Sequence, residues 1–247
     1  MNLLVALVLL LQEKTAEETF KKIEETITKA KTVRVKFEVT RKIGEETVEG
    51  SGTLLLKEGN KARQELLVVF PGGALLKAIL VSDGTNVKFT SPVGLDTFAL
   101  VEKKAPDHLL RSFTVTILQL PLLDSSMMTN NSRDGLNDLS KYVSAREFKH
   151  GDKGKEGSLL LYKGLLDFSG REKFAHPNMS FEVKLWYDPK TWTPRKREVT
   201  LKMGPSTGIT TETYEQFVLD EDLPKETFNL SALNAPDSGD DPAKKDK

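Results

Sequence analysis

Histidines, cysteines and paired carboxylates carry most metal and nucleophilic chemistry in proteins, and this sequence does not arrange them into such a site. The three histidines, His108, His150 and His176, are scattered along the chain, whereas a metal site needs several ligands brought together. The sequence has no cysteine, which excludes disulfides and thiol nucleophiles. No two acidic residues form an apolar-flanked pair that would raise a carboxyl pKa for acid–base catalysis. We therefore expect no catalytic residues, no metal and no cofactor, and predict that the protein is not an enzyme.

The sequence motifs that mark common active sites are also missing. There is no G-x-S-x-G, H-E-x-x-H, phosphate-loop or G-x-G-x-x-G pattern. Gly50-Ser51-Gly52 resembles part of a phosphate loop, but it lies within a strand pattern, which favours a bulge or a close approach of strands. Lys and Arg together number 36, as do Asp and Glu, so nucleic acid is not an expected partner. The property left to carry a function is apolar surface.

The first element that could position this surface is a helix that begins near Thr15. Thr15 and Glu18 have the spacing of a capping box. Apolar residues then recur at helical spacing, while Glu and Lys pairs four residues apart occupy the polar side. The apolar stripe consists of Phe20, Ile23, Ile27 and Ala30.

After this helix the hydrophobic period changes to two, which predicts β-strands. Short turns such as Asp83-Gly84 separate the strands, so neighbours in sequence should pair as antiparallel hairpins. A segment over 106–123 interrupts the series with an approximately helical stripe that Pro121 ends. The predicted strands lie within residues 33–39, 47–57, 66–70, 78–82, 87–90, 142–148, 158–162, 179–187, 195–203 and 210–218.

Together these elements predict an α+β fold: a large curved antiparallel sheet forming an open half-barrel, with an N-terminal amphipathic helix and a helical lid insertion. So few helices cannot cover a wide sheet on both faces. Yet continuous apolar runs, such as 54–56 and 66–70, place apolar side chains on both faces of a strand, which predicts that both faces are buried. A curled sheet whose concave face receives a helix or an apolar ligand satisfies both observations. An ordinary closed core is the alternative.

The chain divides into three parts by composition. Residues 1–14 contain an uninterrupted apolar run from Leu3 to Leu11, which is too short to span a bilayer and has the length of a signal-peptide core. We predict a signal-peptide remnant there, and a buried N-terminal strand or helix is the alternative. Residues 15–232 should form a single domain, and residues 233–247 a disordered charged tail.

Several strings of the sequence resemble the LolA-like family of periplasmic lipoprotein carriers. The resemblance runs through residues 28–37, the Gly50–Lys57 strand and the Val81-Ser82-Asp83-Gly84 hairpin, and it covers most of residues 15–232. It also includes Leu185-Trp186-Tyr187-Asp188 and closes on Thr227-Phe228-Asn229-Leu230. The family has a basic residue before Pro-Asn in the turn after the second strand, where this sequence has Glu58.

The resemblance implies an open half-barrel with a helical lid over an apolar cavity. It implies a soluble periplasmic protein that carries acyl chains of lipoproteins, or other lipids, from an inner-membrane release complex to an outer-membrane acceptor. The missing lipid-attachment cysteine fits a soluble shuttle rather than an anchored receptor. The alternative is an envelope sensor of the same fold that detects lipid and signals to a protein partner.

The lipid-binding candidates are apolar residues on the predicted inner faces of the strands and on the lid, and we expect a monomer. A register error of one residue would turn every strand assignment to the other face. The candidates are Val35, Phe37, Val39, Leu67, Val69, Phe89, Leu109, Phe113, Ile117, Phe181, Val183, Leu185, Val199 and Leu201.

Overall fold

The computed structural model describes residues 15–92, 98–125, 138–167 and 178–232. The predictions for residues 1–14 and 233–247 therefore lie outside the described residues. Within the described ranges, none of the helices has the length and apolar content to cross a lipid bilayer. The same residues do not gather three or more His, Asp or Glu side chains in a way that could hold a metal ion.

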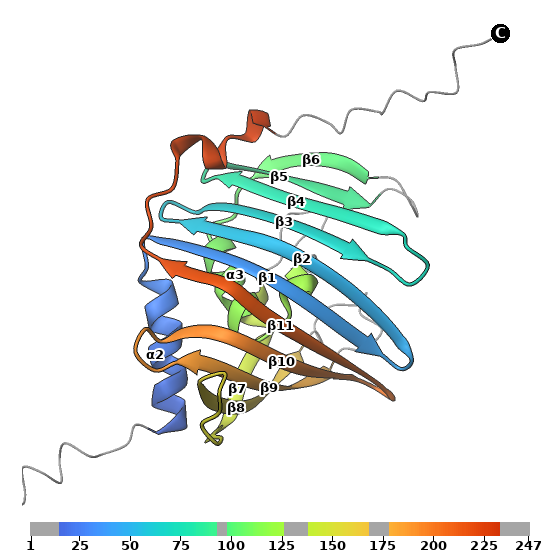
Figure 1. Ribbon diagram of the computed structural model, residues 1–247. Helices are drawn as coiled ribbons and strands as arrows, with labels where there is room; N and C mark the ends of the chain where they lie inside the picture. Colours follow the sequence, from blue (N-terminus) through green and yellow to red (C-terminus); the bar gives the residue numbers. More distant parts are fainter. Residues whose placement is uncertain (1–14, 93–97, 126–137, 168–177, 233–247) are drawn as a thin grey trace, which may run out of the picture.

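The described chain builds one open antiparallel sheet of eleven strands, which curves around the helix α3 (Figure 1). The spatial order is β6-β5-β4-β3-β2-β1-β11-β10-β9-β8-β7, so β6 and β7 form the two edges. This confirms the predicted α+β class with a large open sheet. The strands are β1 (Thr32–Ile43), β2 (Glu46–Lys57), β3 (Lys61–Val69), β4 (Leu75–Asp83), β5 (Asn86–Pro92), β6 (Phe98–Lys104), β7 (Val143–His150), β8 (Ser158–Asp167), β9 (Asn178–Asp188), β10 (Thr193–Met203) and β11 (Ser206–Leu219).

Two meanders meet in the middle of the sheet. Strands β1 to β6 pair in sequence order, as do β7 to β11, and the pairing of β1 with β11 joins them. Asp220 follows β11 directly, and its Oδ1 accepts a hydrogen bond of 2.7 Å from the backbone N–H of Lys31 before β1. The first and last strands are thus fixed side by side.

The helix α2 (Ala16–Thr28) covers the part of the concave face formed by β7, β8 and β10. Its capping box is formed as predicted, because the Thr15 side chain accepts from the Glu18 N–H and the Glu18 carboxylate accepts from the Thr15 N–H. The Phe20 ring lies 4.9 Å from the ring of Phe148 and 5.0 Å from that of Tyr162. This aromatic contact fixes α2 to β7 and β8.

The helix α3 (Leu109–Leu118) lies within the predicted helical segment 106–123, followed by a short 3₁₀ turn at Leu122–Ser125. Every residue from Ser112 to Leu118 is buried. Two further 3₁₀ turns near the end of the described chain, Lys225–Phe228 and Leu230–Ala232, pack beside β3 and β4. The strand β6 was not among the predicted strands.

Gly50-Ser51-Gly52 marks a close approach of strands, which is one of the two readings that the strand pattern favoured. A Cβ at Gly52 would lie 2.7 Å from Cζ of Phe37 and 2.6 Å from the carbonyl oxygen of Glu65. The glycine therefore leaves the space that the Phe37 ring occupies on the inner face of the sheet.

Candidate functional site

Twelve of the fourteen predicted lipid-binding residues are buried on the concave face of the sheet or on α3. They join one continuous apolar cluster with the inner residues of α2. The strand members are Val35, Phe37, Val39, Phe89, Phe181, Val183, Leu185, Val199 and Leu201, and the helix members are Leu109, Phe113 and Ile117.

Leu67 and Val69 do not share this position, because their side chains are 41% and 38% exposed on the opposite face of the sheet. In this part of β3 the buried residues are instead Leu66 and Val68. The run from Leu66 to Phe70 is apolar at every position, so alternation carried no information on which parity faces inward.

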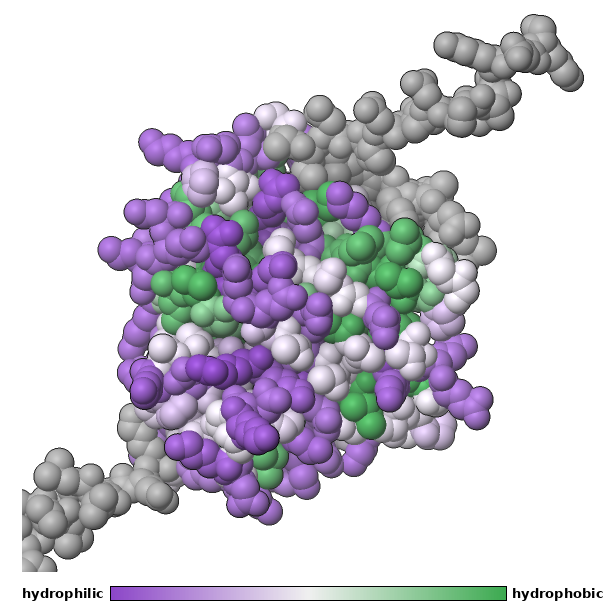
Figure 2. Space-filling view, in the orientation of Figure 1, coloured by the Kyte–Doolittle hydropathy of each residue, from purple (hydrophilic) through white to green (hydrophobic). Residues whose placement is uncertain are grey.

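The outer face of the sheet carries an apolar patch at the end of the β3–β4 hairpin. Figure 2 shows it as hydrophobic colour over that end of the two strands. Leu67, Val69, Phe70 and Leu75 are the exposed apolar residues there, and Leu75 is 67% exposed. Cross-strand pairing of Val69 with Leu75 makes the patch continuous.

The start of α3 is held by the β2–β3 turn and by the segment that precedes β7. Asn60 adopts a left-handed backbone conformation in that turn. Its Nδ2 donates a 2.6 Å hydrogen bond to the carbonyl oxygen of Pro106, and its Oδ1 accepts from the N–H of Leu110 at 3.4 Å. From the other side, Arg111 forms a 2.6 Å ion pair with Asp138.

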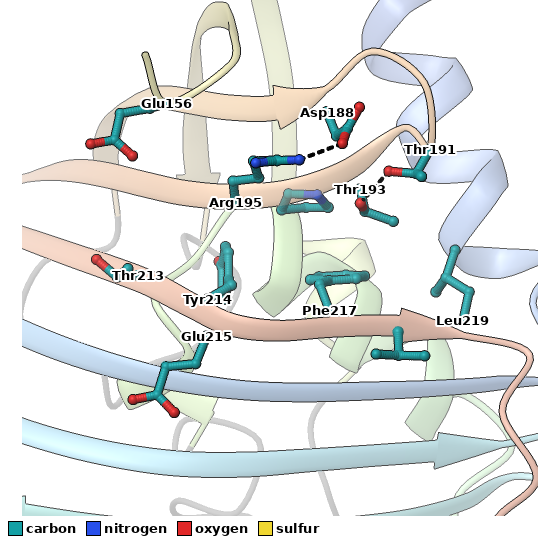
Figure 3. Close-up of a pocket in the computed structure, with 12 residues that line it drawn as sticks. Glu156, Asp188, Thr191, Thr193, Arg195, Thr213, Tyr214, Glu215, Phe217 and Leu219 are labelled. Atoms are coloured by element: carbon teal, nitrogen blue, oxygen red, sulfur yellow. Dashed lines mark hydrogen bonds and ion pairs between the residues drawn. The ribbon is translucent and has the colours of Figure 1, made fainter.

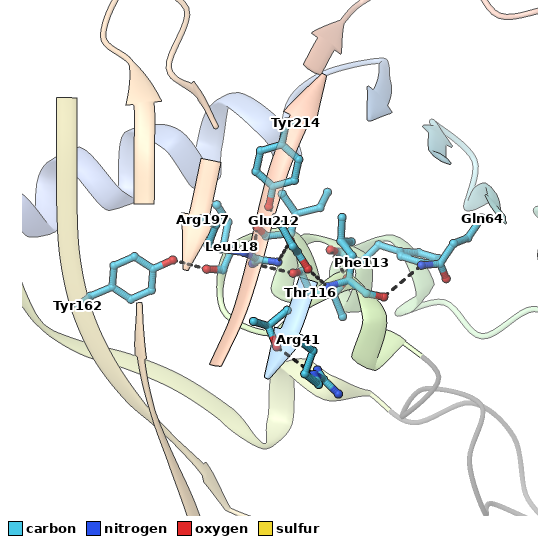
Figure 4. A network of polar contacts seen from close by, with 12 residues as sticks. Arg41, Gln64, Phe113, Thr116, Leu118, Tyr162, Arg197, Glu212 and Tyr214 are labelled. Carbon is cyan, nitrogen blue, oxygen red and sulfur yellow. Dashed lines mark hydrogen bonds and ion pairs between the residues drawn. The ribbon is translucent and has the colours of Figure 1, made fainter. Parts of the chain in front are cut away.

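The end of α3 is held by a buried ion pair on the sheet (Figure 4). The Arg197 guanidinium lies 2.5 Å from the Glu212 carboxylate, and neither side chain has exposed surface. Arg197 Nη1 also donates to the carbonyl oxygens of Thr116 at 2.8 Å and Ile117 at 2.6 Å. These are carbonyls of the last helical turn, which have no intrahelical partner.

Glu212 and two tyrosines complete this polar network. The second Glu212 oxygen accepts from the N–H of Leu122 at 2.5 Å, and the Tyr214 hydroxyl donates to the carboxylate at 2.9 Å. The Tyr162 hydroxyl donates to the carbonyl oxygen of Leu118. Burial raises the pKa of both tyrosines. Burial acts to lower the pKa of Arg197, but the Glu212 carboxylate together with Tyr214 and Tyr162 outweighs it and holds that pKa above its usual value.

Sequence reasoning missed this network, because it searched for pairs of acidic residues, whereas the buried pair joins one carboxylate to one guanidinium. The alternation of β10 contained the signal: Val199 and Leu201 were predicted to face inward, and Arg197 has the same parity. In the same way, Glu212 shares the parity of the buried Thr210 and Tyr214. A charged residue in phase with an apolar strand face indicates a buried pair when a partner strand offers the opposite charge.

A second feature is a cleft of about 660 Å³ between β10 and β11, open to the surface (Figure 3). Tyr214, Phe217 and Leu219 line it from β11, and Pro194 and Arg195 from β10. The Tyr214 and Phe217 rings meet edge to face at 5.7 Å.

A scan of protein-family models and a search among curated proteins found no match to this sequence. Solved structures similar to the chain include LprF from Mycobacterium bovis, with 7% identity, 85% of this chain and 94% of that chain covered, and a TM-score of 0.41. They also include a LolA superfamily protein from Nitrosomonas europaea, with 13% identity, 90% and 100% covered, and a TM-score of 0.37. An outer membrane lipoprotein-sorting protein domain from Vibrio parahaemolyticus matches with 12% identity, 88% and 98% covered, and a TM-score of 0.37. LolA-like structures are thus among those to which this chain is similar.

Proposed function

We propose that this chain binds acyl chains of lipoproteins, or other lipids, on the concave face of its sheet and acts as a soluble periplasmic carrier rather than an enzyme. One observation carries the proposal. The apolar concave face of an open sheet is covered by α3, a ten-residue helix whose two ends are held by polar side chains of the sheet and its turns. In this proposal α3 is the lid, and an acyl chain takes the place of its apolar side chains.

The sequence of α3 is suited to a helix that moves. Thr114, Val115 and Thr116 lie in its centre, and β-branched residues have low helix propensity. A short helix of this kind depends on its contacts with the rest of the protein. When those contacts are replaced by a ligand, the cost of losing the helix is small.

The polar contacts of the closed state are incomplete. Gln119 Oε1 and Arg197 Nε are buried without a hydrogen-bond partner among the described residues. An unsatisfied buried polar atom costs about 1–3 kcal/mol. Opening of α3 would let water reach these atoms and relieve this cost. The closed state is therefore less stable than it would be with both atoms hydrogen-bonded.

The energies of exchange fit a carrier. Burial of the methylenes of a sixteen-carbon acyl chain yields a gross gain of about 11 kcal/mol, at ~0.8 kcal/mol per methylene. Displacing Leu109, Phe113 and Ile117 from the concave face subtracts from this gain, as does ordering of the chain. The remaining affinity is modest, which suits a protein that receives cargo from an inner-membrane release complex and passes it to an outer-membrane acceptor.

The test is direct measurement of lipid on the full chain. Native mass spectrometry of protein purified from a bacterial envelope should show adducts of lipid mass at one to one. Titration with a fluorescent sixteen-carbon fatty acid should saturate. An Asp107→Cys variant, whose only thiol lies on the exposed segment before α3, should report the movement of the lid through an environment-sensitive label. Protein that carries no lipid and ignores the fatty acid would contradict the proposal.

A lipid-responsive regulator that signals to a protein partner is the second candidate. The observation that favours it is the cleft between β10 and β11, which opens to the surface between strands rather than beneath α3. Recovery of the same protein partner only when lipid is bound would support the regulator, and equal recovery without lipid would count against it.

A further inference from the structure

Two bulges face each other where β10 separates from β11. Pro194 pairs with Tyr187 and Lys196 with Trp186, so Arg195 is an extra residue in β10. In the same way, the register of β11 against β1 skips one residue, which makes Glu215 extra. A bulge bends its strand and increases the local twist. The two bends together account for the opening of the sheet at this point.

The opening leaves a strand edge inside the sheet. Pairing between β10 and β11 ends at Lys196 with Thr213. Of the last six residues of β11, Tyr214–Leu219, none pairs with β10, and all except Glu215 pair with β1. Pro194, which has no backbone N–H, lies on the opposite side of the gap, as is usual for a proline at a strand edge. An edge with free backbone groups is a template for another strand.

The lining of the cleft selects the chemistry of that strand. Tyr214, Phe217 and Leu219 give it an apolar wall. The charged lining residues are three carboxylates, Glu156, Asp188 and Glu215, and one guanidinium, Arg195. Asp188 is paired with Arg195, and Glu215 with Lys36, both at 2.5 Å. Glu156 makes no ion pair with any residue that the structure describes.

We propose that this cleft binds an extended polypeptide segment of a partner protein, which adds to β11 as a strand along Tyr214–Leu219. Its side chains alternate, because successive residues of a strand point to opposite faces. One set is apolar and packs on the wall, and the other includes a lysine or arginine beside Glu156. This inference is independent of acyl-chain binding on the concave face.

An acyl chain fits this cleft less well than a peptide does. A hydrocarbon offers no donors or acceptors to the backbone groups of a strand edge, whereas an added strand satisfies them. Glu156, the lining carboxylate without an ion pair among the described residues, also repels a fatty-acid carboxylate or a lipid phosphate. The charges therefore favour a cationic peptide.

Amide hydrogen exchange of the full chain tests the strand edge. In the free protein, amides of residues 214–219 that point toward the gap between β10 and β11 should exchange about tenfold or more faster than amides of residues 208–213, which pair with strands on both sides. A blocked octapeptide that alternates valine with lysine or threonine should slow them. If the free protein already protects all of these amides equally, the edge is closed in solution and the inference is wrong.

Modified peptides test the mode of binding. In an added strand, only the amides of every second residue donate hydrogen bonds to β11. A peptide N-methylated at the valines and a peptide N-methylated at the other residues should therefore differ in affinity. One of the two peptides should lose about tenfold or more in affinity, and the other should keep it. Equal affinity of the two N-methylated peptides would show that binding depends on apolar contacts and not on backbone hydrogen bonds, and it would overturn the inference. Displacement of the parent peptide by a sixteen-carbon fatty acid, in direct competition, would assign the cleft to acyl chains and overturn it as well.

Two variants with matched controls locate the site. Glu156→Lys should weaken the lysine-containing peptide about 2- to 5-fold, while Asp152→Lys, in the same exposed loop outside the cleft, should not. Phe217→Ser should weaken it about tenfold, while Ile209→Ser, an exposed position on the same strand, should not. Fatty-acid binding should be unchanged by Glu156→Lys. Equal effects of cleft variants and controls would refute the site.

Discussion

The Arg197 guanidinium and the Glu212 carboxylate lie 2.5 Å apart with no exposed surface on either side chain. Both also bind the segment around α3, Arg197 through the carbonyls of Thr116 and Ile117 and Glu212 through the N–H of Leu122. The pair therefore joins the sheet to the helix that covers it. Two adjacent strands, β10 and β11, supply it.

Removal of one partner of this pair should destabilise the protein strongly. Arg197→Met leaves the Glu212 charge buried and unpaired, so we expect the free energy of unfolding to fall by about 3–5 kcal/mol. Urea denaturation followed by circular dichroism measures this. The double variant Arg197→Met/Glu212→Leu should recover a large part of the loss, because no isolated charge remains. A double variant as unstable as the single one would contradict this account.

Asn60→Ala should loosen the start of α3 without unfolding the sheet. The substitution removes the hydrogen bonds to Pro106 and Leu110, each worth about 0.5–1.5 kcal/mol. Hydrogen exchange in α3 should rise by about tenfold, and the fluorescent fatty acid should bind more tightly if α3 is the lid. Glu58→Ala, an exposed change in the same turn, is the control and should leave both readouts unchanged.

Neighbouring leucines of β3 should respond very differently to truncation. Leu66 is 4% exposed and Leu67 is 41% exposed. Leu66→Ala should cost about 2–5 kcal/mol of folding stability, because it leaves a cavity in the core. Leu67→Ala should cost less than about 1 kcal/mol and should not change lipid affinity. Thermal unfolding distinguishes the two, and a larger effect at Leu67 would mean that the strand has the opposite parity.

Acidification should release the start of α3 through Asp138. Burial acts to raise the pKa of Asp138, but the Ser140 hydroxyl and the positive charges of His108 and Arg111 outweigh it and lower that pKa below its usual range. A depressed carboxyl pKa stabilises the folded state above the unfolded value of about 3.9, and the stabilisation is lost as the pH falls through the lower folded value.

The pH dependence can be measured by comparison with Asp138→Asn. The wild-type chain should be more stable than the variant at pH 5–7, and the difference should shrink below about pH 4. Stability curves from denaturant titrations at several pH values provide the comparison. A difference that stays constant from pH 6 to pH 3 would rule out ionisation of Asp138 as its source.

The sequence predicted those parts of the fold that local patterns determine. The capping box at Thr15 and the turn at Asp83-Gly84 fix their elements through neighbouring residues, and both are found. Strand parity is also local where apolar and polar residues alternate, as from Val33 to Val39. It failed at Leu67 and Val69, because residues 66–70 are all apolar and the predicted strand left out Lys61, Arg63 and Glu65, whose charged side chains share the parity of Leu67 and Val69.

The polar contacts of the candidate site could not be predicted in the same way. Asn60 and Pro106 are 46 residues apart, and Arg197 and Thr116 are 81 apart. Their meeting depends on how α3 lies under the sheet, which no short-range pattern encodes. The departure of β10 from β11 was hidden for a similar reason, because two bulges in different strands must coincide to open the gap.

The side-by-side placement of β1 and β11 has a consequence for biogenesis. The strand β1 is synthesised before all the other described strands, but it cannot pair with β11, its second neighbour, until the nine strands between them have also been made. Each meander can form through pairing of strands that are neighbours in sequence. Pairing of β1 with β11 instead requires closure of a very long loop, and such steps are slow. Until β1 and β11 pair, each meander has an additional unpaired edge strand. A protein built in this way would benefit from a holding chaperone during maturation, and its halves, produced as separate polypeptides, are suited to fragment complementation.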